Sequence, residues 1–357
     1  MTFIQMSTLP IELWIEILWH IEHGDAGCSR CCNTLKACSL VCSPWREPSQ
    51  RYLFSLVGRD VYRVPKMRES FEATIHPSTA RGRVLGSYVR SLEVNLDHTF
   101  NHTDGTLDMR RFTLLLSRCP RLYELSLHVF DIQKFNQLEM TELRFIANTI
   151  KLRALRMLRF DVQSAVVYQL ISVWPSIQFL TIGSEIATRP PLPLPNIMLY
   201  ELKFCHTSMR PRCLEWLLSG SETSLRVLWF RDTPAPLMKN IVAKHTIHIR
   251  SLRMQRYDKD SADIVRSCTR LEELVLFQLP IFMEVRSLPL TIKHFSFYFR
   301  GSAIKRHPLI PLIRTLPNLR AITCDKDVKL YPDFDAISRI CHANHVELKM
   351  HHSFYHE

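Results

Sequence analysis

The chain has 357 residues, of which 46% are hydrophobic and 22% charged, a composition typical of globular proteins that predicts two or three domains or one elongated one. Nine glycines are too few to favour glycine-rich phosphate-binding loops, and the net charge of +12 is compatible with an acidic protein, nucleic acid or a membrane surface as partner. Eleven cysteines, mostly set in apolar patterns, argue against a disulfide framework and favour a reducing compartment.

The first predicted element is a helix in the segment TLPIELWIEILWHIEH, residues 8–23. Pro10 suits a first helical turn, and Glu12 in the same turn favours the helix dipole. Glu12, Glu16 and His20 form one polar stripe, whereas nearly every other residue up to 21 is apolar. A helix that is apolar over most of its circumference is buried on more than one side, which a unit of about fifty residues does not achieve alone.

Two further short helices are predicted next. Residues 34–42 form the second, which we expect Pro44 to end, and residues 48–57 form the third. A polar loop with the sequence HGDAGCSRCCN separates the first helix from the second. Three short helices with surplus apolar surface, residues 8–57, predict a module that docks onto a partner.

Two stretches of this module resemble the F-box family. The opening motif of that family is matched by Leu9, Pro10, Ile11, Glu12 and Leu13, followed by the pair Ile17 and Leu18. Its closing motif is matched by Ser39, Leu40, Val41, Cys42, Ser43, Pro44, Trp45 and Arg46. The loop between the halves is longer than is usual in the family.

The resemblance covers about 50 residues and implies docking onto a Skp1-type adaptor, and through it onto a cullin-based ubiquitin ligase. It also implies which residues form the docking surface or its support. These are Leu9, Pro10, Ile17, Leu18, Leu40, Val41 and Trp45.

Residues 58–88 are predicted to be a linker or a first cap, and from residue 89 a strand-like pattern recurs every 21 to 33 residues. The strand-like runs are 89–94, 122–127, 152–157, 177–182, 199–204, 225–230, 249–254, 271–276, 292–297, 319–324 and 343–348. Their central apolar residues are Leu92, Leu125, Leu155, Leu180, Leu202, Leu228, Leu252, Leu274, Phe295, Ile322 and Val346. This spacing is typical of leucine-rich repeats.

Amphipathic helical stretches lie between these runs, for example at 109–119, 164–174, 212–220, 261–268 and 303–316. A strand and a helix in each repeat predict a solenoid, in which each unit buries its leucines against its neighbours. This part resembles the degenerate leucine-rich repeats that follow F-boxes. The predicted fold is therefore an α/β solenoid: a small three-helix F-box, then an irregular arc over residues 89–350 with an inner parallel sheet and outer helices.

The helix-free face of that sheet is the predicted client-binding surface. Side chains that flank the central residues point to this face because strands alternate. They mix basic and aromatic types, which dominate binding hot spots and suit an acidic or phosphorylated segment of a client. The candidates are Arg156, Lys203, Trp229, Arg231, Arg253, Phe277 and Tyr298. The alternative is that several of them are only cross-strand packing pairs.

No enzyme signature is present: the sequence lacks nucleophile-elbow, Walker, Rossmann and zincin motifs, and its histidines have no matched nucleophile nearby. Cys28, Cys31 and Cys32 lie close together, but a structural zinc site usually has two clear ligand pairs, so a surface loop is favoured and no metal or cofactor is predicted. The longest apolar run, 166–182, is interrupted by polar residues and does not predict a membrane span, and the first ten residues do not predict a signal peptide.

The predicted function is that of a non-catalytic substrate receptor of a Skp1–cullin–F-box ubiquitin ligase, in the cytoplasm or nucleus, with a client protein of unknown identity. Two alternatives stay open. One is a basic repeat scaffold that binds nucleic acid or another anionic partner, which we rank lower because acidic residues such as Glu201 and Glu273 interrupt the basic strands. The other is an F-box protein that acts as a scaffold outside any ligase.

Overall fold

A computed structural model describes residues 11–23, 32–98, 105–205, 209–231, 236–255, 257–277, 283–298, 308–330 and 333–351. The chain divides into two compact units, Met1–Ala154 and Leu155–Glu357. None of the helices within the described ranges is long and apolar enough to cross a membrane.

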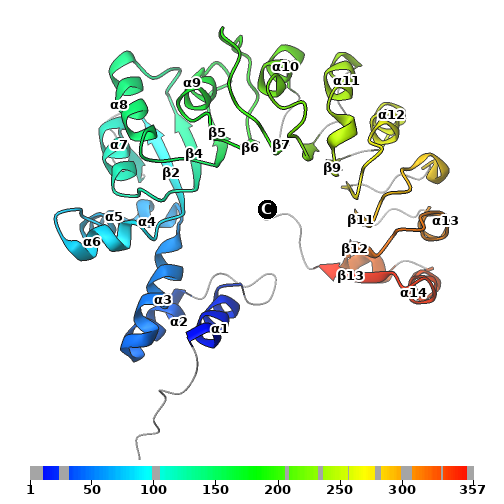
Figure 1. The fold of residues 1–357 in the computed structure, drawn as a ribbon, viewed down its shortest axis with the longest axis horizontal. Coiled ribbons are helices and arrows are strands. Elements are labelled where there is room, and N and C mark those ends of the chain that lie inside the picture. Colours follow the sequence, from blue (N-terminus) through cyan, green and yellow to red (C-terminus); the bar gives the residue numbers. More distant parts are fainter. Residues whose placement is uncertain are drawn as a thin grey trace, which may run out of the picture. The chain divides into compact units, whose positions relative to one another are not determined.

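Unit 1 begins with three helices that pack on one another and continues into a small parallel sheet (Figure 1). Strand β1 and strand β3 pair with successive parts of one edge of β2, and β4 pairs with its other edge. The elements are α1 (Ile11–His23), α2 (Cys32–Val41), α3 (Ser43–Ser55), β1 (Leu56–Val57), α4 (Asp60–Arg63), α5 (Pro65–Thr74), α6 (Ala80–Gly86), β2 (Ser91–Asp97), β3 (Thr106–Leu107), α7 (Met109–Ser117), β4 (Glu124–Phe130) and α8 (Gln137–Ala147).

The third helix differs from the sequence-based prediction. It begins at Ser43 rather than at residue 48, so Pro44 lies in its first turn instead of merely ending the second helix. Proline is tolerated there because the first amides of a helix have no intrahelical acceptor. Pro48 lies inside the same helix, where it is buried against the module. The segment 58–88, expected as a linker or cap, contains the helices α4, α5 and α6.

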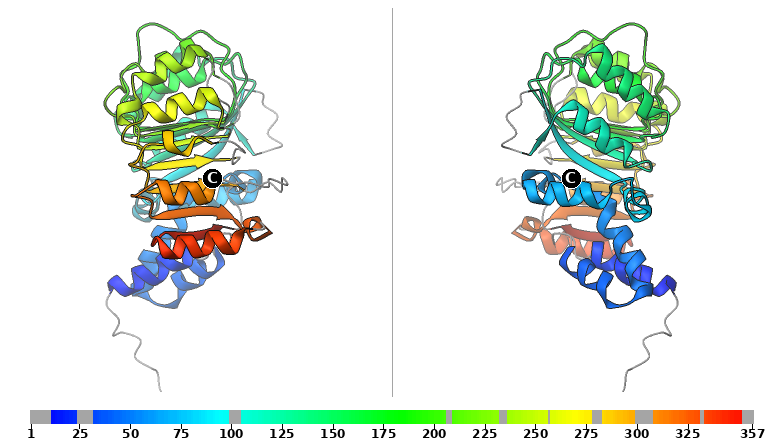
Figure 2. Two further views of the ribbon diagram at one scale, coloured as in Figure 1. Left: turned by 90° about the vertical axis from the view of Figure 1, so that its right-hand side faces the viewer. Right: turned by 90° about the vertical axis from the view of Figure 1, so that its left-hand side faces the viewer.

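Unit 2 repeats a strand and a helical segment along an all-parallel sheet, an α/β solenoid-like arrangement in which one layer of helices covers one face of the curved sheet (Figures 1 and 2). Neighbouring strands follow chain order. The elements are β5 (Ala154–Arg159), α9 (Val166–Val173), β6 (Phe179–Ile182), β7 (Glu201–Phe204), α10 (Pro211–Leu218), β8 (Val227–Phe230), α11 (Pro236–Ala243), η2 (Thr246–His248), β9 (Ser251–Met254), α12 (Lys259–Ser267), β10 (Glu273–Leu276), η3 (Val285–Ser287), β11 (His294–Phe297), α13 (Leu309–Thr315), β12 (Ala321–Asp325), η4 (Lys326–Leu330), α14 (Phe334–Ala343) and β13 (Glu347–His351).

The core of unit 2 is a row of aligned apolar side chains beneath the helices. Leu202, Leu228, Leu252 and Leu274 stand opposite one another on neighbouring strands, and each is fully buried. The sequence-based prediction fails at the last strand, where Ile322 pairs with Leu348 and not with Val346. Val346 precedes β13 and is buried at its start, so the apolar pattern there was read two residues too early.

Candidate functional site

The first candidate surface is a set of exposed apolar side chains on α1 and α2. On α1, Leu13 and Ile17 lie one turn apart on one side of the helix, and Ile15 and Trp19 lie one turn apart on another. All four are 40–47% exposed. On α2, Leu40 is 83% exposed and Val41 is 57% exposed. We call these six residues the apolar set.

The core of the three-helix module is small, which explains why so much apolar surface stays outside it. Leu18, Leu35 and Cys38 are buried together, and four partly buried residues pack against them. Those four are Ile21, Trp45, Tyr52 and Leu53. Burial of the Cys38 thiol raises its pKa, which keeps the group neutral. The module thus fills a narrow centre and leaves the flanks of α1 uncovered.

The structure sorts the predicted docking residues into two groups. Ile17, Leu40 and Val41 are exposed, whereas Leu18 lies in the core and Trp45 is half-buried against it. Leu18 and Trp45 therefore support the fold of the module rather than forming its surface. Leu9 and Pro10 lie outside the described residues.

A pocket of about 330 Å³ adjoins the apolar set between α1 and α3. Ile15 forms part of its wall, together with the two prolines of α3, Pro44 and Pro48, and with Tyr52. Glu47 and Arg51 stand at the same pocket and pair with each other at 2.6 Å. The pocket is thus a mostly apolar recess with one ion pair beside it.

The second candidate surface is the helix-free face of the sheet in unit 2. Strand alternation places Lys203, Trp229 and Arg253 side by side in register on β7, β8 and β9. Phe277 and Tyr298 follow directly after β10 and β11 and share this face. The structure therefore brings five of the seven predicted client-binding residues together.

Three of these side chains form an aromatic stack. The Trp229 and Phe277 rings are 5.5 Å apart with 15° between their planes, and the Phe277 and Tyr298 rings are 5.2 Å apart with 10° between their planes. The Lys203 ammonium lies 5.3 Å and the Arg253 guanidinium 5.6 Å from the centre of the Trp229 ring. Such cation–π contacts fix both cations over the ring.

Burial within the stack is uneven, so the three rings differ in how much surface they expose. Trp229 and Tyr298 are buried, with 9% and 7% exposure, whereas Phe277 between them is half-buried. For Trp229 and Tyr298, packing against neighbouring strands, the alternative considered from the sequence, therefore accounts for most of the side-chain surface. Phe277 and the two cations form the accessible part.

A carboxylate network lies beside the stack. Ser251 donates a short hydrogen bond to Glu273, His294 Nδ1 lies 3.0 Å from the other oxygen of that carboxylate, and Arg253 lies 3.4 Å away. His294 also contacts the Thr323 hydroxyl through Nε2 at 2.8 Å. Burial by itself would raise the pKa of the Glu273 carboxyl, but the hydrogen bonds from His294 and Ser251 and the charge of Arg253 lower it to about 2. Glu273 is therefore ionised and joins Ser251 on β9 to His294 on β11.

The two remaining predicted client-binding residues, Arg156 and Arg231, act electrostatically on the thiol of Cys205. Burial raises the pKa of the Cys205 thiol, while the positive charges of Lys203, Arg156 and Arg231 act on it in the opposite direction. Lys203 also pairs with Glu201 at 3.1 Å. The helix-free face thus carries a cationic cluster beside β7 that continues, through Lys203, into the aromatic stack.

The sequence did not reveal the Glu273 network. The bridge that His294 makes between Glu273 and Thr323 depends on the register of three strands. Ser251, Glu273 and His294 occupy the same register position on successive strands and were the available signal, whereas Thr323 lies two residues beyond that position. No cluster of three or more metal-ligating side chains occurs within the described residues, and Cys28 and Cys31 lie outside them.

Comparisons with known proteins add little to these observations. No protein-family model matches the chain, and no curated protein matches it. Among solved structures, a crystal structure of a protein from Bacteroides fragilis is similar with a TM-score of 0.34 and 12% sequence identity. The similar part covers 66% of this chain and 66% of the Bacteroides fragilis chain, which is slightly less than two thirds of the length of each. A similarity of that size carries no argument about function.

Proposed function

We propose that the chain is a substrate receptor of a Skp1–cullin–F-box ubiquitin ligase. The apolar set on α1 and α2 binds the adaptor, and the helix-free face of unit 2 holds a client protein. The receptor contributes affinity and geometry, while transfer of ubiquitin relies on the proximity of client lysines to the activated ubiquitin. We place it in the cytoplasm or nucleus, where such ligases act.

The observation that carries the proposal is the exposure of the apolar set around so small a core. Burying one large aliphatic side chain contributes about 1.5–3 kcal/mol. Ile17, Leu40 and Val41 are 40%, 83% and 57% exposed, so covering all three supplies somewhat less than twice that amount, which still favours association. The F-box resemblance supplies the identity of the partner, because the exposed residues coincide with positions of its two motifs.

The client-binding half of the proposal is supported by the aromatic stack and its cations. Phe277 offers an apolar contact, and Lys203 and Arg253 lie over the neighbouring Trp229 ring. Aromatic and arginine side chains on a rigid support carry most of the energy in many interfaces. The surface suits a client segment that combines an apolar side chain with acidic groups.

A binding measurement with purified Skp1-type adaptor tests the adaptor half. In the full-length chain we expect Leu40→Lys to weaken adaptor binding about 10- to 100-fold, because a charge replaces a buried contact at the interface. Leu192→Lys is the matched control, since Leu192 is 90% exposed and lies in unit 2. Titration calorimetry with both variants compares the two.

Point substitutions are preferable to removal of residues 1–57, because β1 contributes to the sheet of unit 1 and α3 packs on α6. The adaptor assignment fails if the intact chain does not bind the adaptor, or if Leu40→Lys and Leu192→Lys bind it equally well.

The basic-scaffold alternative makes a different prediction about salt. Nucleic-acid binding through many phosphate contacts weakens steeply as salt concentration rises. On the helix-free face, however, Glu201 pairs with Lys203 and Glu273 contacts Arg253, so the basic row is interrupted. Tight, salt-sensitive binding of single- or double-stranded nucleic acid by the purified chain would favour this alternative.

A further inference from the structure

Within the described residues, two of the segments between strands of unit 2 contain no α-helix: the one between β6 and β7, and the one between β10 and β11. The helical layer contains α12 with 9 residues before β10 and α13 with 7 residues before β12. Between them, before β11, stands only the single turn η3 with 3 residues. The layer is therefore thinner between α12 and α13, where η3 is shorter than the helices on either side of it.

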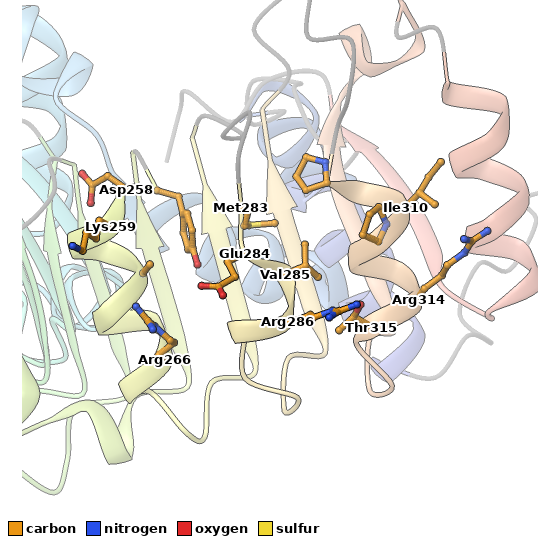
Figure 3. Close-up of a pocket in the computed structure, with 14 residues that line it drawn as sticks. Asp258, Lys259, Arg266, Met283, Glu284, Val285, Arg286, Ile310, Arg314 and Thr315 are labelled. Carbon is orange, nitrogen blue, oxygen red and sulfur yellow. The ribbon is translucent and has the colours of Figure 1, made fainter.

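A groove of about 1000 Å³ lies here between α12 and α13, with η3 at its base (Figure 3). The residues that line it come from all three elements and their flanking turns.

The groove has an apolar floor and a basic rim. Ala262, Met283 and Val285 are buried, and Ile310 is half-buried on the α13 side. Lys259, Arg266, Arg286 and Arg314 are all exposed around them. With Asp258 and Glu284 as the acidic lining residues, the groove carries a net charge of +2.

Most of these cations have no carboxylate partner within the part of the chain that the structure describes. Arg266 pairs with Asp263 at 2.5 Å on the same helix. Lys259, Arg286 and Arg314 form no such pair among the described residues. Asp258 caps α12 by accepting a hydrogen bond from the Ser261 amide at 2.9 Å, so its carboxylate already serves the helix. The rim thus has three unpaired positive charges available to a ligand.

We propose that this groove binds an acidic amphipathic helix of a partner protein, which takes the place of the missing repeat helix. Packed helices lie about 8–10 Å apart and have a diameter of about 10 Å with side chains, the dimensions of one place in such a layer. Apolar side chains at successive turns of the ligand pack on Met283 and Val285. Its acidic side chains meet Lys259, Arg286 and Arg314.

This site is separate from the adaptor and client surfaces of the proposed function. It lies on the helical side of the sheet in unit 2, whereas the aromatic stack lies on the helix-free side. A failure of the adaptor assignment therefore leaves this inference standing, and the reverse also holds.

The test uses a fluorescently labelled peptide of about 14 residues, long enough to form about four helical turns. Leucines at every third or fourth position form its apolar face, and glutamates flank that face. We expect binding to the full-length chain with a Kd of about 10–100 µM by fluorescence anisotropy, since the interface is small. Hydrogen–deuterium exchange is expected to slow in α12, η3 and α13.

Charge reversal supplies the decisive comparison. Arg286→Glu with Arg314→Glu should weaken binding of the acidic peptide at least about tenfold and should create binding of the corresponding lysine peptide. Both arginines are exposed, so folding is unaffected. Arg212→Glu with Arg339→Glu, at exposed positions of α10 and α14, is the matched control and should bind as the unaltered chain does.

A second peptide, with a proline in the middle of the same sequence, tests the helical form of the ligand and should bind at least about tenfold more weakly. The inference is overturned if the acidic peptide does not bind at millimolar concentration, if the proline peptide binds equally well, or if reversal of Arg286 and Arg314 changes neither peptide's affinity.

Discussion

The helical module at the start of unit 1 and the repeats of unit 2 bury their apolar side chains in different ways. In α2, Leu35 is fully buried while Leu40, five residues later, is 83% exposed. In β8, Leu228 is fully buried, and so are its in-register neighbours Leu202 and Leu252. Each repeat finds its apolar cover in the next repeat, whereas the module covers only one side of each helix with its own residues.

The two regions also differ in the kind of surface that they leave exposed. A repeat that is complete on its helical side leaves its other side to polar and aromatic groups such as the Glu273 network and the stack around Phe277. A module with an incomplete apolar cover gains stability when another protein supplies the rest. Stability and binding should therefore separate cleanly between the two regions, and three substitutions test that separation.

The largest effect is expected for Leu228→Ala in the row of central leucines. Removing a fully buried leucine side chain costs about 2–5 kcal/mol, because the transfer free energy is lost and a cavity remains. The cavity cannot close easily, since Leu202 and Leu252 are held on paired strands on both sides. Urea unfolding followed by circular dichroism measures the change in midpoint and in the free energy of unfolding.

Leu192→Ala is the control for this substitution, because the same atoms are removed from a side chain that is 90% exposed in the same unit. Its effect should stay within about 0.5 kcal/mol. Equal effects of the two substitutions would show that the central row is not the main source of stability in unit 2.

Glu273→Gln is expected to have the next largest effect, through ionisation. The pKa of this carboxyl is lowered from 4.5 to about 2 in the folded chain. A depressed pKa stabilises the folded state above the ordinary pKa, and this stabilisation declines as the pH falls toward the folded pKa. At pH 7 the glutamine variant should be less stable by about 2–3 kcal/mol, with the difference shrinking between about pH 4.5 and pH 2.

Unfolding curves at several pH values check this prediction. Glu347→Gln is a matched control, because Glu347 occupies the equivalent register position on β13 but its side chain is 64% exposed. At pH 7 the control should change the free energy of unfolding by less than about 0.5 kcal/mol. A constant difference between the chain and Glu273→Gln down to pH 2 would contradict the network as described.

Much of the fold was predictable from the spacing of apolar residues. All eleven strand-like runs correspond to parallel strands, from β2 to β13, because the Leu-x-x-Leu-x-Leu pattern contains both the strand and the residue that leads into it. For that reason, most strands begin about two residues after the first residue of the predicted run. In β8, for example, Leu225 is buried before the ladder starts, and the amides of Arg226 and Val227 both donate to the Tyr200 carbonyl.

The sites were less predictable, since they depend on what the repeats do not share. The aromatic stack joins residues 229, 277 and 298, whose contact follows from a register that no single stretch of sequence encodes. The groove over η3 arises from a repeat that is one helix short. The spacing of 21 residues between Leu274 and Phe295 did not signal this difference, because Leu252 and Leu274 are only 22 residues apart and still enclose α12.

The smallest change in stability is expected for Leu40→Ala, at the other end of the comparison. Leu40 is mostly exposed, so truncation removes few contacts within the chain, and the free energy of unfolding should change by less than about 0.5 kcal/mol. Leu35→Ala on the same helix is the counterpart: Leu35 is fully buried beside Leu18, and its truncation should cost at least about 2 kcal/mol. Under the proposed adaptor assignment, Leu40→Ala should nevertheless lower the affinity for the adaptor, because it removes an interface contact from a chain that is still folded. Thermal unfolding of both variants, with and without adaptor, separates a residue that stabilises the module from one that contributes only to binding. Equal destabilisation by both substitutions would mean that Leu40 is already buried within the chain.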